Sequence, residues 1–340
     1  MASAPSPSPS SATPVHDMAA KGFNVANDLY DRARPSYQPA VLSWIRKTVR
    51  KVDAASGKLN VLEVGAGTGI FTRALLAHPD WKDDVGELRA IEPSEGMRAQ
   101  FAKTTIPASA DDTSPTTAGD STSPTITVAD GHFASLPVPD GWADVIVIAQ
   151  AFHWCPDHAA AVAEFARALR RGGPLVLVWN LEDRDAAPWV AQLRDRIERH
   201  EQGAPQFRLG LWRAFAETRE WRDNFAARPP GVGGEEEQKE GGEGAGVDFD
   251  EQKEEVGGGE AIPHTTTHTH AFALPATRAL AIDRACSKSY VATLPAGAKA
   301  EVIADVRAIL DRAEGMAWLD RARGVFAYPY KATVVVGWRV

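Results

Sequence analysis

The chain has 340 residues, 44% of them hydrophobic, which is enough for a full α/β domain with a buried core. No run of roughly 18 uncharged apolar residues occurs, so no transmembrane helix and no membrane partner are expected. The net charge of −8 is concentrated in residues 235–260, where eleven acids stand against two lysines, and the remainder is nearly neutral. Because no clustered basic stripe is evident, no nucleic-acid partner is expected either.

The two cysteines, Cys155 and Cys286, form no CxxC pattern, which predicts neither a disulfide framework nor a zinc cluster. The N-terminal stretch is rich in Ser and Pro and lacks the apolar segment of a secretory signal. We therefore expect a cytoplasmic protein that is a monomer or a homodimer.

Three stretches carry too little apolar surface to offset the entropy of ordering, and they are predicted to be disordered. They are a tail over residues 1–16 and two inserts over residues 107–124 and 228–263. The rest, residues 17–340, is predicted to be one domain. Its cofactor-binding core is placed at about residues 40–180, and a substrate-covering region at about 181–330.

Strands and helices alternate through the first half of the chain. The predicted strands are residues 60–64, 88–92, 125–129, 144–149 and 174–179. The predicted helices between them are residues 69–78, 94–103 and 157–170, the second capped by Ser94. Further on, residues 265–274 and 333–340 are predicted strands, and residues 299–311 a helix. This order predicts an α/β fold: a doubly wound, Rossmann-like, mostly parallel seven-stranded sheet with helices on both faces and an antiparallel last strand.

A glycine-rich loop, GAGTG at residues 65–69, follows the first predicted strand. Glycines at such spacing permit a tight turn and close approach of the backbone to a ligand. The dinucleotide fingerprint GxGxxG would need its last glycine at Ile70. A GxGxG with an acid two residues before it, here Glu63, better suits S-adenosylmethionine, whose ammonium group needs acceptors.

Polar residues follow the next three parallel strands, where an open α/β sheet binds its ligands. Glu92 ends the second strand and can accept both ribose hydroxyls. Asp130 ends the third and can accept from the adenine amino group, with His132 or Phe133 flanking the ring. Gln150 follows the fourth strand. Together these strand ends predict one cofactor site.

At this point the sequence resembles the small-molecule S-adenosylmethionine-dependent methyltransferases of class I, in the methyltransferase type 11 group. The likeness is strongest to bacterial and fungal members related to trans-aconitate methyltransferase, and it spans roughly residues 21–340 apart from the inserts. The segments that carry it are YDRARPSY (30–37), VLEVGAGTGIFT (61–72), IEPSEGM (91–97), ADGHFASLP (129–137), AQAFHW (149–154), LRRGGPLVLVWN (169–180) and SKSYVATLP (287–295).

The resemblance adds residues to those found from the strand ends, and places an N-terminal segment over the cofactor. The predicted cofactor-binding residues are Glu63, Gly65, Ala66, Gly67, Thr68, Gly69, Glu92, Pro93, Met97, Asp130, Gly131, His132, Ala149 and Gln150. The predicted substrate-binding residues are Tyr30, Arg34, Tyr37 and Trp154.

The chemistry leaves several roles open. His153 is the best-placed candidate for a general base, although it can equally be a hydrogen-bonded histidine at a strand end. Trp154 either walls the substrate site or packs in the core. Arg34 either binds a substrate carboxylate in bidentate fashion or pairs with Asp31 or Glu92. Cys155 is expected to be a small buried residue rather than a nucleophile.

Two further clusters have an ordinary explanation beside a functional one. Three tryptophans after the fifth strand either line an apolar substrate pocket or pack in the core, which is the default; they are Trp189, Trp212 and Trp221. Three histidines, His264, His268 and His270, match no zinc spacing, so no metal is expected.

The sequence therefore predicts an S-adenosylmethionine-dependent methyltransferase that acts on a small molecule, a carboxylic acid or another metabolite. A non-catalytic S-adenosylmethionine-binding regulatory protein is the alternative from another class. An NAD-dependent Rossmann oxidoreductase is disfavoured by Ile70 at the third glycine position.

Overall fold

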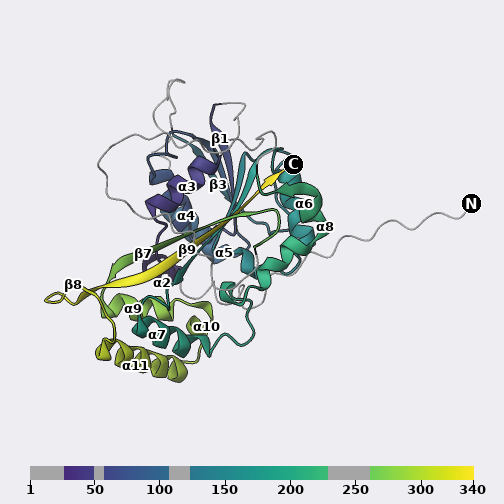
Figure 1. Cartoon of the computed structure of the whole chain (residues 1–340). Helices are drawn as coiled ribbons and strands as arrows, with labels where there is room; N and C mark the ends of the chain where they lie inside the picture. Colours follow the sequence, from purple (N-terminus) through teal and green to yellow (C-terminus); the bar gives the residue numbers. More distant parts are fainter. Residues whose placement is uncertain (1–26, 50–56, 107–122, 229–260) are drawn as a thin grey trace, which may run out of the picture.

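The computed structural model describes residues 27–49, 57–106, 123–228 and 261–340 (Figure 1). The predicted disordered tail lies outside the described residues, as do nearly all of the two predicted inserts. Among the described residues, no helix has both the length and the apolar character to cross a bilayer.

A single sheet forms the centre of the fold, with its strands in the order β3-β2-β1-β4-β5-β9-β6. Its first five strands are parallel, and all of them were expected from the sequence. They are β1 (Leu59–Val64), β2 (Val85–Ile91), β3 (Thr125–Ala129), β4 (Val145–Ala149) and β5 (Pro174–Glu182). The doubly wound, mostly parallel fold class is thereby confirmed.

The far side of the sheet is antiparallel and longer than predicted. The whole of β5 pairs with β9 (Val325–Arg339), which also pairs with β7 (Thr266–Ala276). Two short strands, β6 (Phe225–Ala226) and β8 (Trp318–Asp320), also pair with β9, so the described sheet has nine strands rather than seven. Strands of two or three residues carry no periodic signal that a sequence can reveal.

Helices cover both faces of the sheet, as predicted (Figure 1). The first face packs against α3 (Pro39–Val49), α4 (Ile70–Ala77) and α5 (Glu95–Thr105). The second packs against α6 (His158–Ala168) and α8 (Arg219–Asn224). Strand β4 shows why both faces are apolar: Val145 and Val147 point into one cluster, and Ile146 and Ile148 into the other.

A third apolar cluster joins a group of helices to the N-terminal part of β9 (Figure 1). The group comprises α7 (Pro188–Glu198), α9 (Arg278–Cys286), α10 (Ser289–Ala292) and α11 (Ala296–Arg312). The N-terminal helix α2 (Asn27–Ala33) lies against α9 and α5. This arrangement brings α2, at the start of the described chain, against α9 of the later part.

The three tryptophans after β5 are core residues, so the interpretation that they line a substrate pocket is wrong. Trp189 is fully buried against Phe326 and Tyr328 in the third cluster. Trp212 and Trp221 belong to the second-face cluster. Trp221 packs over Gly337, where an added Cβ would clash with its ring.

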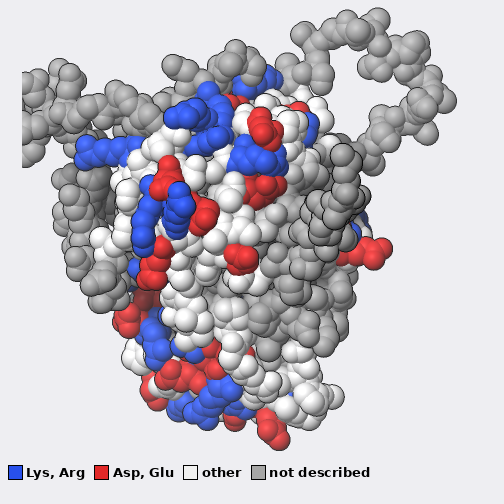
Figure 2. Space-filling view, turned by 90° about the vertical axis from the view of Figure 1, so that its right-hand side faces the viewer, with Lys and Arg blue, Asp and Glu red and all other residues white. Residues whose placement is uncertain are grey.

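Acidic and basic side chains lie side by side on the face shown in Figure 2, around a central area with few charges. Ion pairs among the described residues include those of Arg167 with Asp140 and Glu164. The surface charge of this face is therefore mixed in sign.

Candidate functional site

The glycine loop between β1 and α4 is built on left-handed backbone. Gly65, Gly67 and Gly69 have φ angles of +75°, +58° and +86°, a region that favours glycine. The amides of Gly65 and Ala66 both donate to the carbonyl oxygen of Ile91 at 2.7 and 3.1 Å. The loop is thereby tied to the carboxyl end of β2, directly beside Glu92.

Gly65 and Gly69 are each required for a steric reason, and the reasons differ. A Cβ on Gly65 would lie 2.5 Å from the Cβ of Ala151, so the loop can approach the segment after β4 only with glycine there. Gly69 caps α4, and a side chain there would collide with Phe101 and Thr105 of α5. Gly69 does not line the cavity described next, so its role in this structure is to close the loop onto α5.

A cavity of about 370 Å³ lies beyond the carboxyl ends of β1, β2 and β4. This volume is in the range of ligand pockets, which begin at about 300 Å³. Sixteen of the predicted site residues line it: Tyr30, Arg34, Tyr37, Glu63, Gly65, Ala66, Gly67, Thr68, Glu92, Pro93, Met97, Gly131, His132, Ala149, Gln150 and Trp154. Other lining residues were not predicted as part of the site, among them Phe71, Ser94, Ala151 and Cys155–Asp157.

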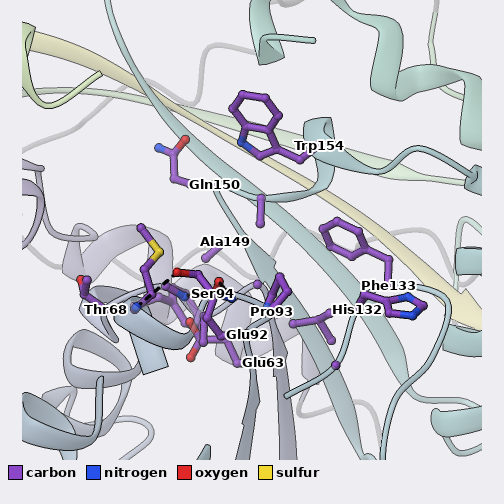
Figure 3. A pocket seen from close by; sticks show the side chains of 18 of the residues that line it. Glu63, Thr68, Glu92, Pro93, Ser94, His132, Phe133, Ala149, Gln150 and Trp154 are labelled. Atoms are coloured by element: carbon purple, nitrogen blue, oxygen red, sulfur yellow. Dashed lines mark hydrogen bonds between the residues drawn. The ribbon is translucent and has the colours of Figure 1, made fainter. Parts of the chain in front are cut away.

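Glu92 is nearly inaccessible to solvent and links the loop to the next helix. One of its carboxylate oxygens accepts from the Gly67 amide and the other from the Ser94 amide, both at 2.9 Å. Burial raises the pKa of Glu92, and the two amide bonds oppose that rise. The carboxylate is therefore held in a fixed orientation at the cavity wall, as Figure 3 shows.

Glu63 is buried at the floor of the same cavity (Figure 3). Thr72 donates a hydrogen bond to its Oε2, whereas Oε1 has no partner among the described residues. Burial raises the pKa of Glu63 to about 8. A cationic group placed at Oε1 would relieve both the missing hydrogen bond and the cost of the buried charge.

Asp130, predicted to bind the adenine edge, does not line the cavity. Its side chain is 74% exposed and forms an ion pair with Arg98 of α5 at 2.9 Å. Arg98 also donates to the backbone oxygen of Glu92, so it draws Asp130 to the outside of the sheet edge. His132 and Phe133, which were predicted to flank the adenine ring, both line the cavity (Figure 3).

Gln150 and Trp154 lie across the cavity from Glu92 and Thr68 (Figure 3). Gln150 adopts a left-handed φ of 60°, and its side-chain amide donates to the backbone oxygen of Asn180 at 2.7 Å. A bond of this kind fixes the side chain against β5. Trp154 lines the cavity, which supports the wall interpretation over pure core packing.

His153 does not line this cavity, and its hydrogen bonding and burial argue against the predicted role of general base. Trp179 donates from Nε1 to His153 Nδ1 at 3.2 Å, which assigns the remaining ring proton to Nε2. Burial, with Arg34 and Lys288 nearby, lowers the pKa of His153 to about 3. A neutral imidazole whose free lone pair is already occupied is a poor proton acceptor.

The segment before α3, which the resemblance places over the cofactor, contributes lining residues to the cavity. Tyr30, Arg34 and Tyr37 all line it. Asp31 binds Thr68 and Arg73 instead of Arg34, and Glu92 is held by backbone amides. Both ion pairs that the sequence suggested for Arg34 are therefore excluded.

Arg34 instead stands at the border of a second, smaller cavity of about 60 Å³. The two cavities share Tyr30, Arg34, Gln150 and Trp154 as lining residues. The further lining residues include Glu182, Arg194, Glu198, Arg208, Lys288 and Tyr290. No role was predicted for these side chains, although Lys288 and Tyr290 belong to SKSYVATLP (287–295), one of the segments that carry the resemblance.

The remaining candidates are structural in this fold. Burial raises the pKa of the Cys155 thiol to about 12, so this side chain is no nucleophile near neutral pH. His268 stacks on Trp44, with ring centroids 4.6 Å apart. Within the described ranges, no group of three or more His, Cys, Asp and Glu side chains converges as metal ligands would.

The fold and the cavity define a Rossmann-like α/β protein with a cofactor-sized site at the carboxyl ends of its parallel strands. Residues 62–177 match the family model of a methyltransferase domain. This segment runs from β1 to β5 and contains most of the cavity lining. This part of the chain is therefore similar to a methyltransferase domain.

Individual relatives agree with this assignment. An uncharacterized methyltransferase-like protein of Schizosaccharomyces pombe is 29% identical over 184 residues, which cover 54% of this chain and 60% of that protein. An uncharacterized methyltransferase of Mycobacterium bovis is 32% identical over 177 residues, or 52% of this chain and 59% of that protein. The matched part thus spans about three fifths of each relative.

One solved structure shares the fold over nearly its full length. It comes from Anaeromyxobacter dehalogenans and is provisionally described as a type II methyltransferase. The two chains superpose with a TM-score of 0.51 at 15% identity, covering 90% of this chain and 97% of the other. At that identity the likeness concerns the fold alone, and the relation to trans-aconitate methyltransferase stays a prediction.

Proposed function

We propose that this protein transfers the methyl group of S-adenosylmethionine to a small-molecule acceptor. The observation that carries the proposal is the cavity beyond β1, β2 and β4, in which the glycine loop, Glu63 and Glu92 meet. The family match over residues 62–177 supports the choice of cofactor.

The lining residues fit the chemical groups of that cofactor. The buried Oε1 of Glu63 lacks a partner among the described residues and suits an ammonium group. Glu92 keeps lone pairs on both oxygens after accepting from two amides, and these suit ribose hydroxyls. Phe133 and Met97 supply apolar walls for a purine. Asp130, being outside the cavity, has no part in this proposal.

Catalysis in this proposal depends on positioning. When bound, S-adenosylmethionine supplies an electrophilic methyl group on a sulfonium. Tyr30 and Trp154 line the part of the cavity that borders the second cavity, where they would exclude water and hold an acceptor. Alignment of the reacting atoms in a near-attack arrangement can provide several kcal/mol of the rate enhancement.

The structure's lack of a base at His153 favours an acceptor that needs little help in losing a proton. A carboxylate is such a nucleophile, since it is already ionised at neutral pH. A carboxylic acid acceptor is therefore the narrower form of the proposal.

The test is transfer of isotope-labelled methyl from S-adenosylmethionine to a small-molecule extract, with product analysis by mass spectrometry. A labelled small-molecule product is the expected result. If the protein binds S-adenosylmethionine but labels nothing, it is a non-catalytic binding protein, and the proposed enzyme activity is wrong.

A further inference from the structure

The second cavity adjoins the proposed cofactor site and is far smaller. Its volume of about 60 Å³ leaves room for a few non-hydrogen atoms, whereas the first cavity measures about 370 Å³. Gln150 and Trp154 line both, so the two cavities adjoin at these side chains. The second cavity therefore has the size and place of a pocket for one end of an acceptor.

Most charges around the second cavity are already paired. Lys288 donates to both carboxylate oxygens of Glu182 at 2.7 and 2.8 Å. The other two acids bind arginines, in the pairs Arg194 with Glu198 and Arg208 with Glu201. Three acids and three cations in the lining thereby compensate one another.

Arg34 is a fourth cation and is not compensated. None of the described carboxylates lies within ion-pair distance of it. Its Nη2 donates to the backbone oxygen of Ser287 at 3.3 Å, and its guanidinium lies over the Tyr30 ring at 4.9 Å. Its Nε is buried and finds no acceptor among the described residues. A buried donor left in this way is costly unless a ligand satisfies it.

The positive charge of Arg34 affects side chains that line the second cavity. Burial and then Arg34 and Lys288 lower the pKa of His153. Arg34 also opposes protonation of Lys288, whose pKa falls to about 8, mainly through burial. Arg34 thus places a positive charge beside His153 and Lys288, which an anion bound there would neutralise.

We propose that the second cavity binds a carboxylate of the methyl acceptor, held by the Arg34 guanidinium in a cavity also lined by Lys288. An Arg side chain matches a planar carboxylate through two parallel N–H donors, and the cavity has room for such a group. This carboxylate anchors the acceptor, while the atom to be methylated lies in the first cavity. That the bound carboxylate belongs to a methyl acceptor rests on the proposed function, whereas the anion site itself does not.

Acetate is the probe for this site, because it is the carboxylate group with a single methyl attached. Protein labelled with ¹⁵N-tryptophan reports on the cavity through two indole N–H signals, from Trp154 in the lining and Trp179 bonded to His153. Sodium acetate is titrated against sodium chloride of the same ionic strength, with and without saturating S-adenosylhomocysteine. We expect both signals to shift saturably with acetate alone, in the presence of S-adenosylhomocysteine as well as in its absence.

Variants assign the response to Arg34. In Arg34→Gln the acetate midpoint should rise about tenfold or more, the usual effect of losing a hydrogen bond to a charged group. Arg34→Lys keeps the charge without the planar fork and should lie between the two. Arg32→Gln, two residues earlier in the chain, is the matched control, since Arg32 is exposed, and it should leave the midpoint unchanged. Unaltered signals from the other tryptophans show that each variant is folded.

Four results overturn the proposal. The wild-type signals do not saturate with acetate; or Arg34→Gln has the wild-type midpoint; or inorganic phosphate binds more tightly than acetate, which indicates a phosphoryl group. In the fourth, S-adenosylhomocysteine abolishes the acetate response, which makes Arg34 a ligand of the cofactor's own carboxylate. If S-adenosylhomocysteine itself fails to bind while acetate still does, the proposed function is wrong and the anion site remains.

Discussion

The two neighbouring cavities of this protein are built in opposite ways. The larger one collects backbone and side chains from the ends of consecutive parallel strands, and its lining is largely apolar with two buried carboxyl groups. The smaller one takes its charged side chains from segments far apart in sequence, such as Arg34, Glu182 and Lys288. The first cavity is assembled from short segments that each carry a local sequence signal. The second depends on contacts between segments far apart in the sequence.

This difference bears on function. A cofactor shared by a whole family needs a constant site, which a strand, a glycine loop and a helix can supply locally. An acceptor differs from one enzyme to the next, and its site can be assembled from loops and helices that vary. The comparison predicts that variants in the first cavity act on cofactor affinity and that variants in the second act on the acceptor.

The largest loss of cofactor affinity is expected from Gly65→Ala. The new Cβ would lie 2.5 Å from Ala151, so the loop must move away from the cavity. Calorimetry should show S-adenosylmethionine binding at least about a hundredfold weaker. Gly172→Ala is the matched control, because Gly172 has a similar φ of +79° with open space around it. Equal affinity in both variants would contradict the close approach at Gly65.

Glu63→Gln should make the free protein more stable. The folded protein retains a proton on Glu63 up to about pH 8, whereas the unfolded chain releases it near its ordinary value of 4.5. Stability is therefore lost as the pH rises through this window, and the amide avoids that loss. The gain at neutral pH should reach up to about 3 kcal/mol, measured by denaturant unfolding. Glu87→Gln, on the neighbouring strand β2, serves as control; an unstabilised Glu63→Gln would refute the buried-acid interpretation.

The same carboxyl group should make cofactor affinity depend on pH. An ammonium at Glu63 favours the ionised carboxylate, so binding releases a proton below about pH 8. Affinity in the wild type should rise from about pH 6 to about pH 8, by no more than about tenfold per pH unit, and then level off. Glu63→Gln should lose this rise. A wild-type affinity that does not change with pH would place the ammonium elsewhere.

Glu92→Ala and Asp130→Ala separate the cavity wall from its surroundings. Removal of the Glu92 carboxylate leaves the ribose hydroxyls and two amides without acceptors, which should weaken binding by about 2 kcal/mol. Asp130 is exposed and paired with Arg98, so its removal should change affinity by less than about threefold. Competition against a fluorescent cofactor analogue measures both. Comparable losses would show that Asp130 reaches the ligand.

The smallest effect is expected from His153→Asn. A general base contributes about 10²- to 10⁴-fold, so a change in kcat below about tenfold would exclude that role. Because the pKa of His153 is already about 3, the pH profile of kcat between about pH 6 and 8 should keep its shape. Loss of an ascending limb in the variant would restore His153 as the base.

The sequence was sufficient for the cofactor side because its signals are local. The Ser94 cap was expected from residue type and spacing, and its hydroxyl does accept from the Met97 amide. Strand β4 was predictable because its residues are buried on both faces and therefore form a continuous apolar run. Gly65 and Gly67 were recognised from spacing alone, and their left-handed backbone agrees.

The predictions that differ from the structure have a common physical cause, which is contact between residues far apart in the sequence. Asp130 stands at the right strand end, but Arg98 from α5 turns it outward, a contact between distant residues. His153 follows β4 as predicted, yet its ring is bound by Trp179 on β5. The second cavity depends on Lys288 meeting Glu182 across more than a hundred residues, which no spacing rule reveals.

The most direct test of the central claim is calorimetric titration of the wild-type protein with S-adenosylmethionine and, separately, with NAD⁺ and NADH. The account predicts one site per chain with micromolar affinity for S-adenosylmethionine and no heat of binding from either nicotinamide cofactor. Nicotinamide binding, or no binding of S-adenosylmethionine, would contradict it.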